Sequence, residues 1–305
     1  MALRGPPTDR TLSDLREFGV VNLDKPPGPS SHQVAAWLRD LAGVDRAAHA
    51  GTLDPKVTGC LPVLLGDATR AAQVFDDSVK GYVAVLELHR PAPADFEAVV
   101  AEFEGPLLQK PPRKSAVSRR LRTRTVHELE VLEREDRRAL LRIRCESGTY
   151  VRKLCHDLGL ALGTGANMGA LRRVETYPFD DRSLVTMHDV TDALAEAESG
   201  DESLLRECIA PAERALVHLP GLTVAPSAAE QVAEGAPVYA PGVIDGTAPE
   251  SVDFDGLRPD PAADAARGSL VVCYTPNGAA VCLGHLVGDV DADSGTVVEL
   301  ERVLV

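Results

Sequence analysis

One aspartate stands out in the sequence because it lies in a loop bounded by glycines. Asp54 precedes a proline in the stretch His49-Ala50-Gly51-Thr52-Leu53-Asp54-Pro55-Lys56-Val57-Thr58-Gly59-Cys60, which leads into an apolar run. A residue before proline is pushed from the helical region toward an extended conformation, so we expect the Asp54 side chain to project from the backbone. An isolated Asp-Pro pair is also typical of an ordinary turn between a helix and a strand. The neighbouring motifs therefore decide whether Asp54 is a catalytic carboxylate or a turn residue.

Three further segments accompany the Asp54 stretch. One precedes it, Asn22-Leu23-Asp24-Lys25-Pro26-Pro27-Gly28-Pro29-Ser30-Ser31-His32. Two follow it, Val79-Lys80-Gly81-Tyr82 and Glu146-Ser147-Gly148-Thr149-Tyr150-Val151-Arg152-Lys153-Leu154. In this order the four segments resemble the motifs of the TruB family of pseudouridine synthases, in the form found in its archaeal and eukaryotic (dyskerin-type) branch. Four ordered matches over residues 20 to 175 are far more specific than any single motif.

The resemblance implies a fold of the α/β (α+β) class with two domains. We expect a short N-terminal arm over residues 1–18, which packs late or stays mobile. A catalytic domain over residues 19–220 would be built on a mixed, largely antiparallel sheet. Residues 221–305 resemble a PUA domain, and their short strands separated by glycine and proline turns are typical of a small β-barrel. Residues 245–268, rich in Asp, Pro, Ala and Gly, are predicted to be an acidic surface insertion without a clear element.

The resemblance also implies the chemistry. Conversion of uridine into pseudouridine breaks the N-glycosidic bond, rotates the uracil and rejoins it through carbon, so we expect neither a cofactor nor a metal. Asp54 could attack the sugar at C1′ or remove the C2′ proton, and the sequence leaves both routes open. Both require an ionised carboxylate shielded from water. We expect Arg152 to pair with Asp54, and Tyr82 to stack on the uracil near the C5 proton.

Four further residues of the motifs are predicted to bind the substrate: Lys25, His49, Lys80 and Leu154. His49 would hold the flipped nucleotide, or serve as a structural histidine. Lys25 could neutralise a phosphate, brace the Asp54 loop, or remain a solvated loop lysine. Outside the motifs, Tyr82 would be an ordinary core tyrosine and Arg152 would pair with another group.

The charge distribution answers an objection to an RNA substrate. The formal net charge is −14, whereas phosphate binding usually requires a basic surface. Residues 110–144 nevertheless hold twelve Arg or Lys against five acids, and residues 221–305 hold thirteen acids against three Arg. We interpret 110–144 as an RNA-facing region with a basic strand face, and the general acidity as adaptation to a very salty cytoplasm, as in a halophilic archaeon.

Cysteine spacing and hydropathy bound the cellular context. The six cysteines show no C-x-x-C spacing, so we predict no disulfides and no zinc site. No apolar stretch approaches the roughly 20 residues of a membrane span, and the N-terminus lacks a signal-peptide core. We therefore expect a cytoplasmic protein with no membrane partner.

Periodicity predicts the elements that position the motifs. Ser30 or Ser31 should cap a helix with Val34, Trp37, Leu38 and Leu41 in its core stripe. Strands are expected over 81–88 and 141–145, and a helix with Leu154, Leu158 and Leu162 in one stripe. The connection Val117 to Thr125 is only nine residues long, too short for a large RNA-gripping arm.

We therefore predict an RNA pseudouridine synthase. The favoured mode is the catalytic subunit of a box H/ACA guide ribonucleoprotein that modifies rRNA, with guide RNA and small accessory H/ACA subunits as partners. The alternative is a stand-alone enzyme for the T-loop uridine of tRNA. A non-catalytic RNA-binding scaffold has no need of Asp54, Tyr82 and Arg152 together, and a general acidic binding protein leaves the basic run unexplained.

Overall fold

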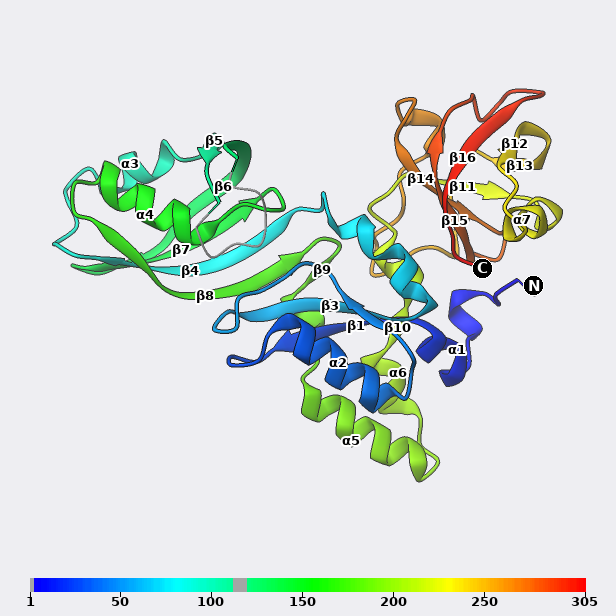
Figure 1. Cartoon of the computed structure of the whole chain (residues 1–305), viewed down its shortest axis with the longest axis horizontal. Coiled ribbons are helices and arrows are strands. Elements are labelled where there is room, and N and C mark those ends of the chain that lie inside the picture. The colour runs from blue at the N-terminus through cyan, green and yellow to red at the C-terminus, as the bar shows by residue number, and fades with distance from the viewer. Residues whose placement is uncertain (1–2, 112–119) are drawn as a thin grey trace.

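The computed structural model describes residues 3–111 and 120–305, so residues 117–119 of the predicted connection from Val117 to Thr125 lie outside the described residues. The chain forms a ten-stranded sheet and a separate six-stranded sheet (Figure 1). The first sheet has the order β10-β1-β3-β8-β4-β7-β6-β5, with β2 paired to β3 and β9 to β8. Its pairs are antiparallel except for the parallel pair of β3 and β8. The predicted mixed, largely antiparallel sheet is therefore confirmed.

The bounds of the elements are as follows. The strands of the first sheet are β1 Phe18–Lys25, β2 Ala47–His49, β3 Thr58–Gly66, β4 Lys80–Leu88, β5 Gly105–Gln109, β6 Arg122–Arg134, β7 Arg138–Cys145, β8 Ala166–Thr176, β9 Phe179–Asp180 and β10 Ala210–Pro211. Those of the second are β11 Gly221–Val224, β12 Val238–Tyr239, β13 Val243–Asp245, β14 Leu270–Tyr274, β15 Ala280–Leu286 and β16 Thr296–Val303. The α-helices are α1 Leu12–Glu17, α2 Ser31–Ala42, α3 Phe96–Ala101, α4 Val151–Ala161, α5 Met187–Glu198, α6 Ser203–Cys208 and α7 Pro226–Ala233. Short 3-10 helices are η1 Pro7–Asp9, η2 Asp67–Phe75, η3 Asp181–Ser183, η4 Ala212–Ala215, η5 Ala240–Gly242 and η6 Ala262–Asp264.

The parallel pairing of β3 with β8 joins the two halves of the large sheet. It is short, with Thr58 opposite Arg172 and Gly59 opposite Arg173. Gly59 has a φ of 98°, and a Cβ at this position would lie 2.1 Å from the carbonyl oxygen of Arg173. Only glycine permits this approach, which explains one glycine of the Asp54 stretch.

Two groups of helices cover the same face of the large sheet. Buried side chains of α2, α5 and α6 pack on β1 and β3, and those of α3 and α4 pack on β4, β6 and β7. Tyr82 and Leu171 contact both of these clusters. The boundary between the two helix groups therefore crosses the sheet at β4 and β8, and the candidate site lies there.

Helix α2 begins as predicted but buries a different stripe. Ser30 accepts a hydrogen bond from the backbone N–H of Gln33 and forms a capping box with it. The prediction that Trp37 belongs to the core is wrong, because Trp37 is 48% exposed. The buried stripe is set by Val34, Ala35, Leu38 and Ala42, and at 3.6 residues per turn Trp37 falls on its margin.

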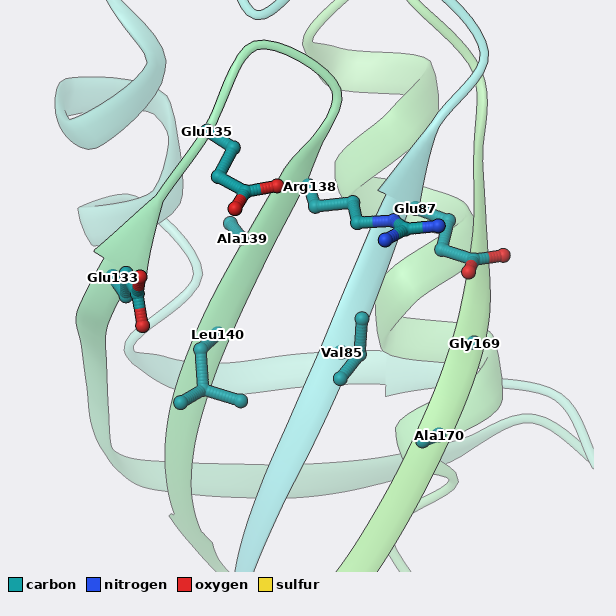
Figure 2. A pocket seen from close by; sticks show the side chains of 9 residues that line it. All are labelled: Val85, Glu87, Glu133, Glu135, Arg138, Ala139, Leu140, Gly169 and Ala170. Carbon is teal, nitrogen blue, oxygen red and sulfur yellow. The ribbon is translucent and has the colours of Figure 1, made fainter.

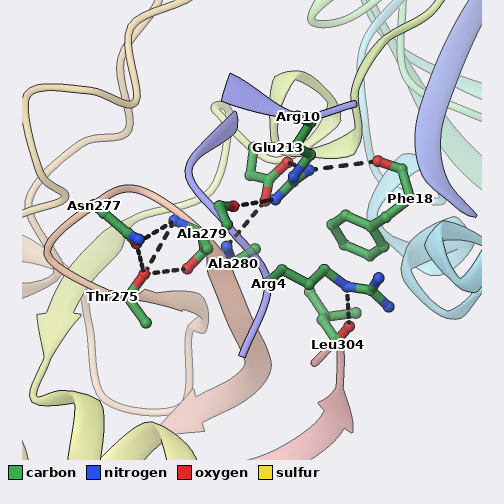
Figure 3. A network of polar contacts seen from close by, with 10 residues as sticks. Arg4, Arg10, Phe18, Glu213, Thr275, Asn277, Ala279, Ala280 and Leu304 are labelled. Carbon is green, nitrogen blue, oxygen red and sulfur yellow. Dashed lines mark hydrogen bonds and ion pairs between the residues drawn. The ribbon is translucent and has the colours of Figure 1, made fainter. Parts of the chain in front are cut away.

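The N-terminal arm is packed, which corrects the expectation of a late-packing or mobile segment. Leu12 and Leu15 of α1 are buried, and the Arg10 side chain makes a two-point ion pair with Glu213 of η4 at 2.5 and 2.7 Å (Figure 3). Glu213 also accepts a hydrogen bond from the backbone N–H of Ala280 in β15, at 3.0 Å. The arm, the first sheet and the second sheet thus meet at one buried carboxylate.

The second sheet wraps into a nearly closed small barrel, as predicted. Its order is β12-β16-β15-β14-β11-β13, and β11 pairs parallel with β14. Segment 245–268, which connects β13 to β14, is not a detached surface insertion, because Val252 and Ala262 are fully buried. Val252 packs in the same cluster as Phe18 of β1 and Tyr274 of β14. The composition of the segment did not predict its packing against the core, because the buried side chains occur singly among polar residues.

Candidate active site

The Asp54 loop is fixed on both sides of the aspartate. The backbone N–H of Val57 donates to the carbonyl of Asp54 at 2.9 Å, which closes a turn with Pro55 at its second position. The Ser31 hydroxyl accepts from the N–H of Leu53 at 2.9 Å. Leu53 and Val57 are both buried in the α2 cluster. Asp54 therefore does lie in a turn, and this turn holds its carboxylate outward.

Lys25 braces this loop. Its side chain is fully buried, and Nζ donates to the carbonyls of Pro26, Pro55 and Val57 at 3.0, 3.1 and 2.9 Å. Burial lowers the pKa of Lys25, while the nearby Asp54 charge opposes this shift. Of the three roles considered for Lys25, the structure supports the loop brace and not contact with a phosphate.

Arg173 is a residue of the candidate site that the sequence analysis missed. It is 1% exposed, and its guanidinium donates to the carbonyls of Cys60, Ala50 and Gly51 at 2.7, 3.2 and 3.3 Å. Arg173 therefore ties together the two ends of the Asp54 stretch from the neighbouring strand β8. The sequence shows only an Arg172-Arg173 pair in a strand, and the parallel pairing of β3 with β8 that gives it meaning is a tertiary feature.

Arg152 pairs with Asp54, as expected from the motifs. Arg152 lies in the first turn of α4, and its Nη2 donates to Oδ2 of Asp54 across the boundary between the two helix groups. The two side chains are 54% and 56% exposed, so the expected exclusion of water is wrong for the protein alone. An exposed pair of this kind contributes little to stability. Its consequence is orientation of the carboxylate.

Tyr82 lies at the point where the two helix-covered clusters meet, and it interacts with Arg173. It is partly exposed and belongs to β4. Burial raises the pKa of Tyr82, and contact with the Arg173 guanidinium opposes the rise. The hydroxyl therefore stays neutral at neutral pH and can donate or accept a hydrogen bond.

Lys80 and Leu154 lie beneath the surface. Nζ of Lys80 donates to the carbonyls of Phe75 and Ser78 at 2.9 and 3.1 Å, and burial lowers the pKa of Lys80 to about 7. Leu154 is fully buried in the cluster under α3 and α4. The structure does not support the direct substrate contact predicted for either residue, since both side chains face the protein interior.

His49 forms a pair with a second histidine. Its Nε2 lies 3.0 Å from Nδ1 of His32 in the first turn of α2. Burial, followed by the charges of His32 and Arg173, lowers the pKa of His49. His32 is the last residue of the first motif segment, and the packing of α2 against β2 brings it next to His49.

Comparison with known proteins identifies the family. Residues 39–95 match the model described as the TruB family pseudouridylate synthase N-terminal domain, residues 152–217 match the tRNA pseudouridylate synthase B C-terminal domain, and residues 5–35 match the DKCLD (NUC011) domain. A protein of Haloarcula marismortui called "Probable tRNA pseudouridine synthase B" is 68% identical over 305 residues, covering 100% of this chain and 94% of its own length. The chain belongs to the TruB family of pseudouridylate synthases. It is therefore an isomerase.

Other relatives extend the match over both sheets. A protein of Halobacterium salinarum with the same description is 61% identical, and the alignment covers the full length of both chains. A solved structure entitled "Crystal Structure of a Cbf5-Nop10-Gar1 Complex" superposes with a TM-score of 0.89 at 42% identity, over 99% of this chain and 90% of that one. "Structure of H/ACA RNP bound to a substrate RNA containing 2'-deoxyuridine" gives a TM-score of 0.87 at 40% identity, with 99% and 90% covered. The fold is thus that of a pseudouridine synthase domain with a small β-barrel PUA domain.

Acidic residues of neighbouring strands largely neutralise the basic face predicted for β7, which corrects its interpretation as a basic surface. Arg142 pairs with Glu130 at 2.8 Å, and Arg144 pairs with Glu175 at 3.1 Å. These partners come from β6 and β8, and sequence counting cannot place them. Arg124 instead lies beside Gly148, whose loop leads into α4, so its guanidinium stays close to the side of the sheet that carries Arg152.

A hollow of about 440 Å³ lies on the large sheet (Figure 2), and Asp54 does not line it. It is lined by Val85, Glu87, Glu133, Glu135, Arg138, Ala139, Leu140, Gly169 and Ala170. Val85 and Glu87 alternate along β4 with the buried Ala84 and Leu86, so the hollow is on the face without helices. Asp54, Tyr82 and Arg152 are not among its lining residues.

In residues 3–111 and 120–305, no group of three or more His, Cys, Asp or Glu side chains is placed to hold a metal ion. All six cysteines are buried free thiols. Within the same residues, no helix is long and apolar enough to cross a membrane.

Proposed function

We propose that this protein isomerises uridines of rRNA as the catalytic subunit of a box H/ACA guide ribonucleoprotein. The observation that carries the proposal is the oriented Asp54–Arg152 pair at the boundary between the two helix groups, in a chain whose two sheets superpose together on Cbf5 in H/ACA assemblies. Guide RNA, target RNA and small accessory subunits are the proposed partners. The superposition includes the barrel, which a free-standing catalytic domain would not need.

In this proposal the target uridine leaves its stack and enters beside Asp54, which costs a few kcal/mol of unstacking. Tyr82 stacks on the uracil, and its neutral hydroxyl lies near the C5 proton. The Asp54 carboxylate attacks C1′ or removes the C2′ proton, and Arg152 holds it in one orientation. Because the carboxylate is exposed in the protein alone, the bound RNA must exclude the water.

The remaining residues of the site act through the loop. Lys25 and Arg173 hold the backbone on both sides of Asp54, so the carboxylate is positioned before RNA arrives. Leu154 supports the floor of the site, and Lys80 supports the turn before β4. His49, with His32, lies at the entrance, where the flipped nucleotide would pass.

The proposed domain organisation is a catalytic domain over 19–220 and a PUA domain over 221–305, with residues 1–18 bound to both. The PUA domain would anchor one end of the guide RNA at a fixed distance from Asp54. We further propose a cytoplasmic location in a salt-rich cell, supported by the acidic composition and by the Haloarcula and Halobacterium relatives.

The second candidate is a stand-alone enzyme for the T-loop uridine of tRNA, which the descriptions of the sequence relatives favour. One experiment separates the two modes. The purified protein is incubated in molar KCl with a tRNA transcript or an rRNA fragment, with and without guide RNA and accessory subunits, and pseudouridine is mapped by chemical modification. We expect weak activity on free tRNA and high activity on the guided target. Full-speed modification of tRNA without guide or partner would establish the second candidate instead.

A further inference from the structure

Asp67, the first residue of η2, is contacted by three arginines. Nη2 of Arg4 lies 3.0 Å from Oδ2, and the Nη2 atoms of Arg46 and Arg70 lie 2.6 and 3.3 Å from Oδ1. We call these four residues the Asp67 cluster. Three guanidinium groups against one carboxylate leave a local charge of about +2 in a chain of net charge −14.

The three arginines are not equivalent. Arg4 is anchored, because Nε donates to the carbonyl of Leu304 at 3.2 Å and the guanidinium lies 4.4 Å from the centre of the Phe18 ring (Figure 3). Arg46 and Arg70 are 56% and 35% exposed. Each guanidinium carries five N–H donors, and one carboxylate cannot accept them all. Arg46 and Arg70 therefore keep donors that face solvent.

The cluster lies between the barrel and the active site. Nη1 of Arg70 is 3.5 Å from the carbonyl of Val303 at the end of β16. Arg46 directly precedes β2, whose last residue is His49 at the entrance of the Asp54 loop. At about 3.3 Å per strand residue, Arg46 and His49 are roughly 10 Å apart along β2. An RNA strand that reaches from the barrel to Asp54 along β2 passes Arg46.

A purely structural ion cluster accounts for only part of this arrangement. It explains Arg4, whose side chain is 15% exposed and binds the barrel. It does not explain the more exposed Arg46, since exposed ion pairs stabilise proteins by about 0–1 kcal/mol. Asp45, the exposed neighbour of Arg46 in sequence, is one further carboxylate near the cluster and lowers its positive charge.

We propose that Arg46 and Arg70 bind a phosphate group of the RNA backbone between the barrel and the active site. This inference rests on the proposed function, because it requires an RNA that contacts both parts of the chain. Asp67 holds the two guanidinium groups side by side when no RNA is bound, because both contact its Oδ1 atom. Arginine suits this role because its planar fork matches two phosphate oxygens. The acidic barrel needs such a contact beside it to hold a polyanion.

The test is the salt dependence of RNA affinity in the full-length protein. The double variant Arg46→Gln/Arg70→Gln is compared with the control Arg39→Gln/Arg142→Gln, which removes the same charge from exposed arginines elsewhere. The dissociation constant of a fluorescent guide RNA hairpin, and separately of a tRNA transcript, is measured by anisotropy over a range of KCl. We expect the slope of log Kd against log salt to fall by about 1 in the double variant and to stay unchanged in the control.

A second variant reverses the sign of the effect. Asp67→Asn removes the competing carboxylate, so RNA should bind more tightly, whereas a structural cluster would give no tightening. Thermal unfolding shows which variants are folded. If the double variant is unfolded, the RNA affinity of Asp67→Asn alone tests the proposal. An unchanged slope in a folded double variant, or no tightening in Asp67→Asn, overturns the proposal. The anisotropy assay measures RNA binding and not turnover. A failure of guide-dependent turnover would therefore contradict the proposed function and not the phosphate contact.

Discussion

The substitution Lys25→Met tests whether the Asp54 loop is held in place before RNA binds. Lys25 is fully buried, and its three hydrogen bonds end on carbonyls of the two segments that meet under Asp54. Methionine keeps the apolar stem and removes every donor. Pro55 keeps one partner, the N–H of Gly28 at 2.8 Å, so the carbonyls of Pro26 and Val57 lose most.

The magnitude follows from those bonds. Hydrogen bonds to a charged group contribute roughly 1.5–3 kcal/mol each, but removal of Lys25 also relieves the cost of burying its charge. A net loss of about 2–4 kcal/mol is therefore expected, and the melting temperature should fall by several degrees. Turnover should fall more than RNA affinity, because the carboxylate loses its position while the RNA-contacting surface is kept.

Lys56→Met is the matched control, since Lys56 is an exposed lysine on the same turn. Melting temperature, RNA affinity at several KCl concentrations and single-turnover rates are measured for both variants. The reasoning fails if Lys25→Met is as stable and as active as Lys56→Met. A phosphate contact would instead lower RNA affinity and its salt dependence without lowering the melting temperature.

Three further predictions address the chemistry, the buried lysine and the acidity. Asp54→Asn should abolish turnover and leave RNA affinity near that of the wild type, and residual activity within about tenfold of wild type would exclude the catalytic role. Arg152→Lys should also lower turnover strongly, because a point ammonium cannot replace the planar guanidinium. The pKa of Lys80 in the folded protein is about 7, below its unfolded value, so the unfolded chain holds more protons than the folded one above pH 7. Stability should therefore rise as pH increases from about 7 toward 10. The melting temperature of Lys80→Met should lack this rise, and a pH profile unchanged from that of the wild type would refute the prediction. Melting temperature should increase from dilute to molar KCl because screening relieves repulsion among the acids of residues 221–305, and a flat or falling curve would make the acidity incidental.

The sequence by itself indicated the candidate site residues and the type of sheet that carries them. Asp54 before a proline, the apolar alternation of β4 and β7 and the Ser30 cap of α2 are local patterns, and local backbone preference acts in the same way in any fold. The four ordered motifs were sufficient to indicate the family. They also placed Arg152 opposite Asp54, although 98 residues separate the two in the chain.

Tertiary structure alone decided which charged residues support the loop and which face solvent. Arg173 and Lys25 are polar residues that a sequence assigns to a surface, but pairing of β3 with β8 and the return of the loop against β1 provide enough carbonyls to bury them. The acids that neutralise β7 and the arginines around Asp67 likewise come from distant segments. Burial and ion pairing depend on which surfaces meet, and the sequence around one residue does not show which distant residue will contact it.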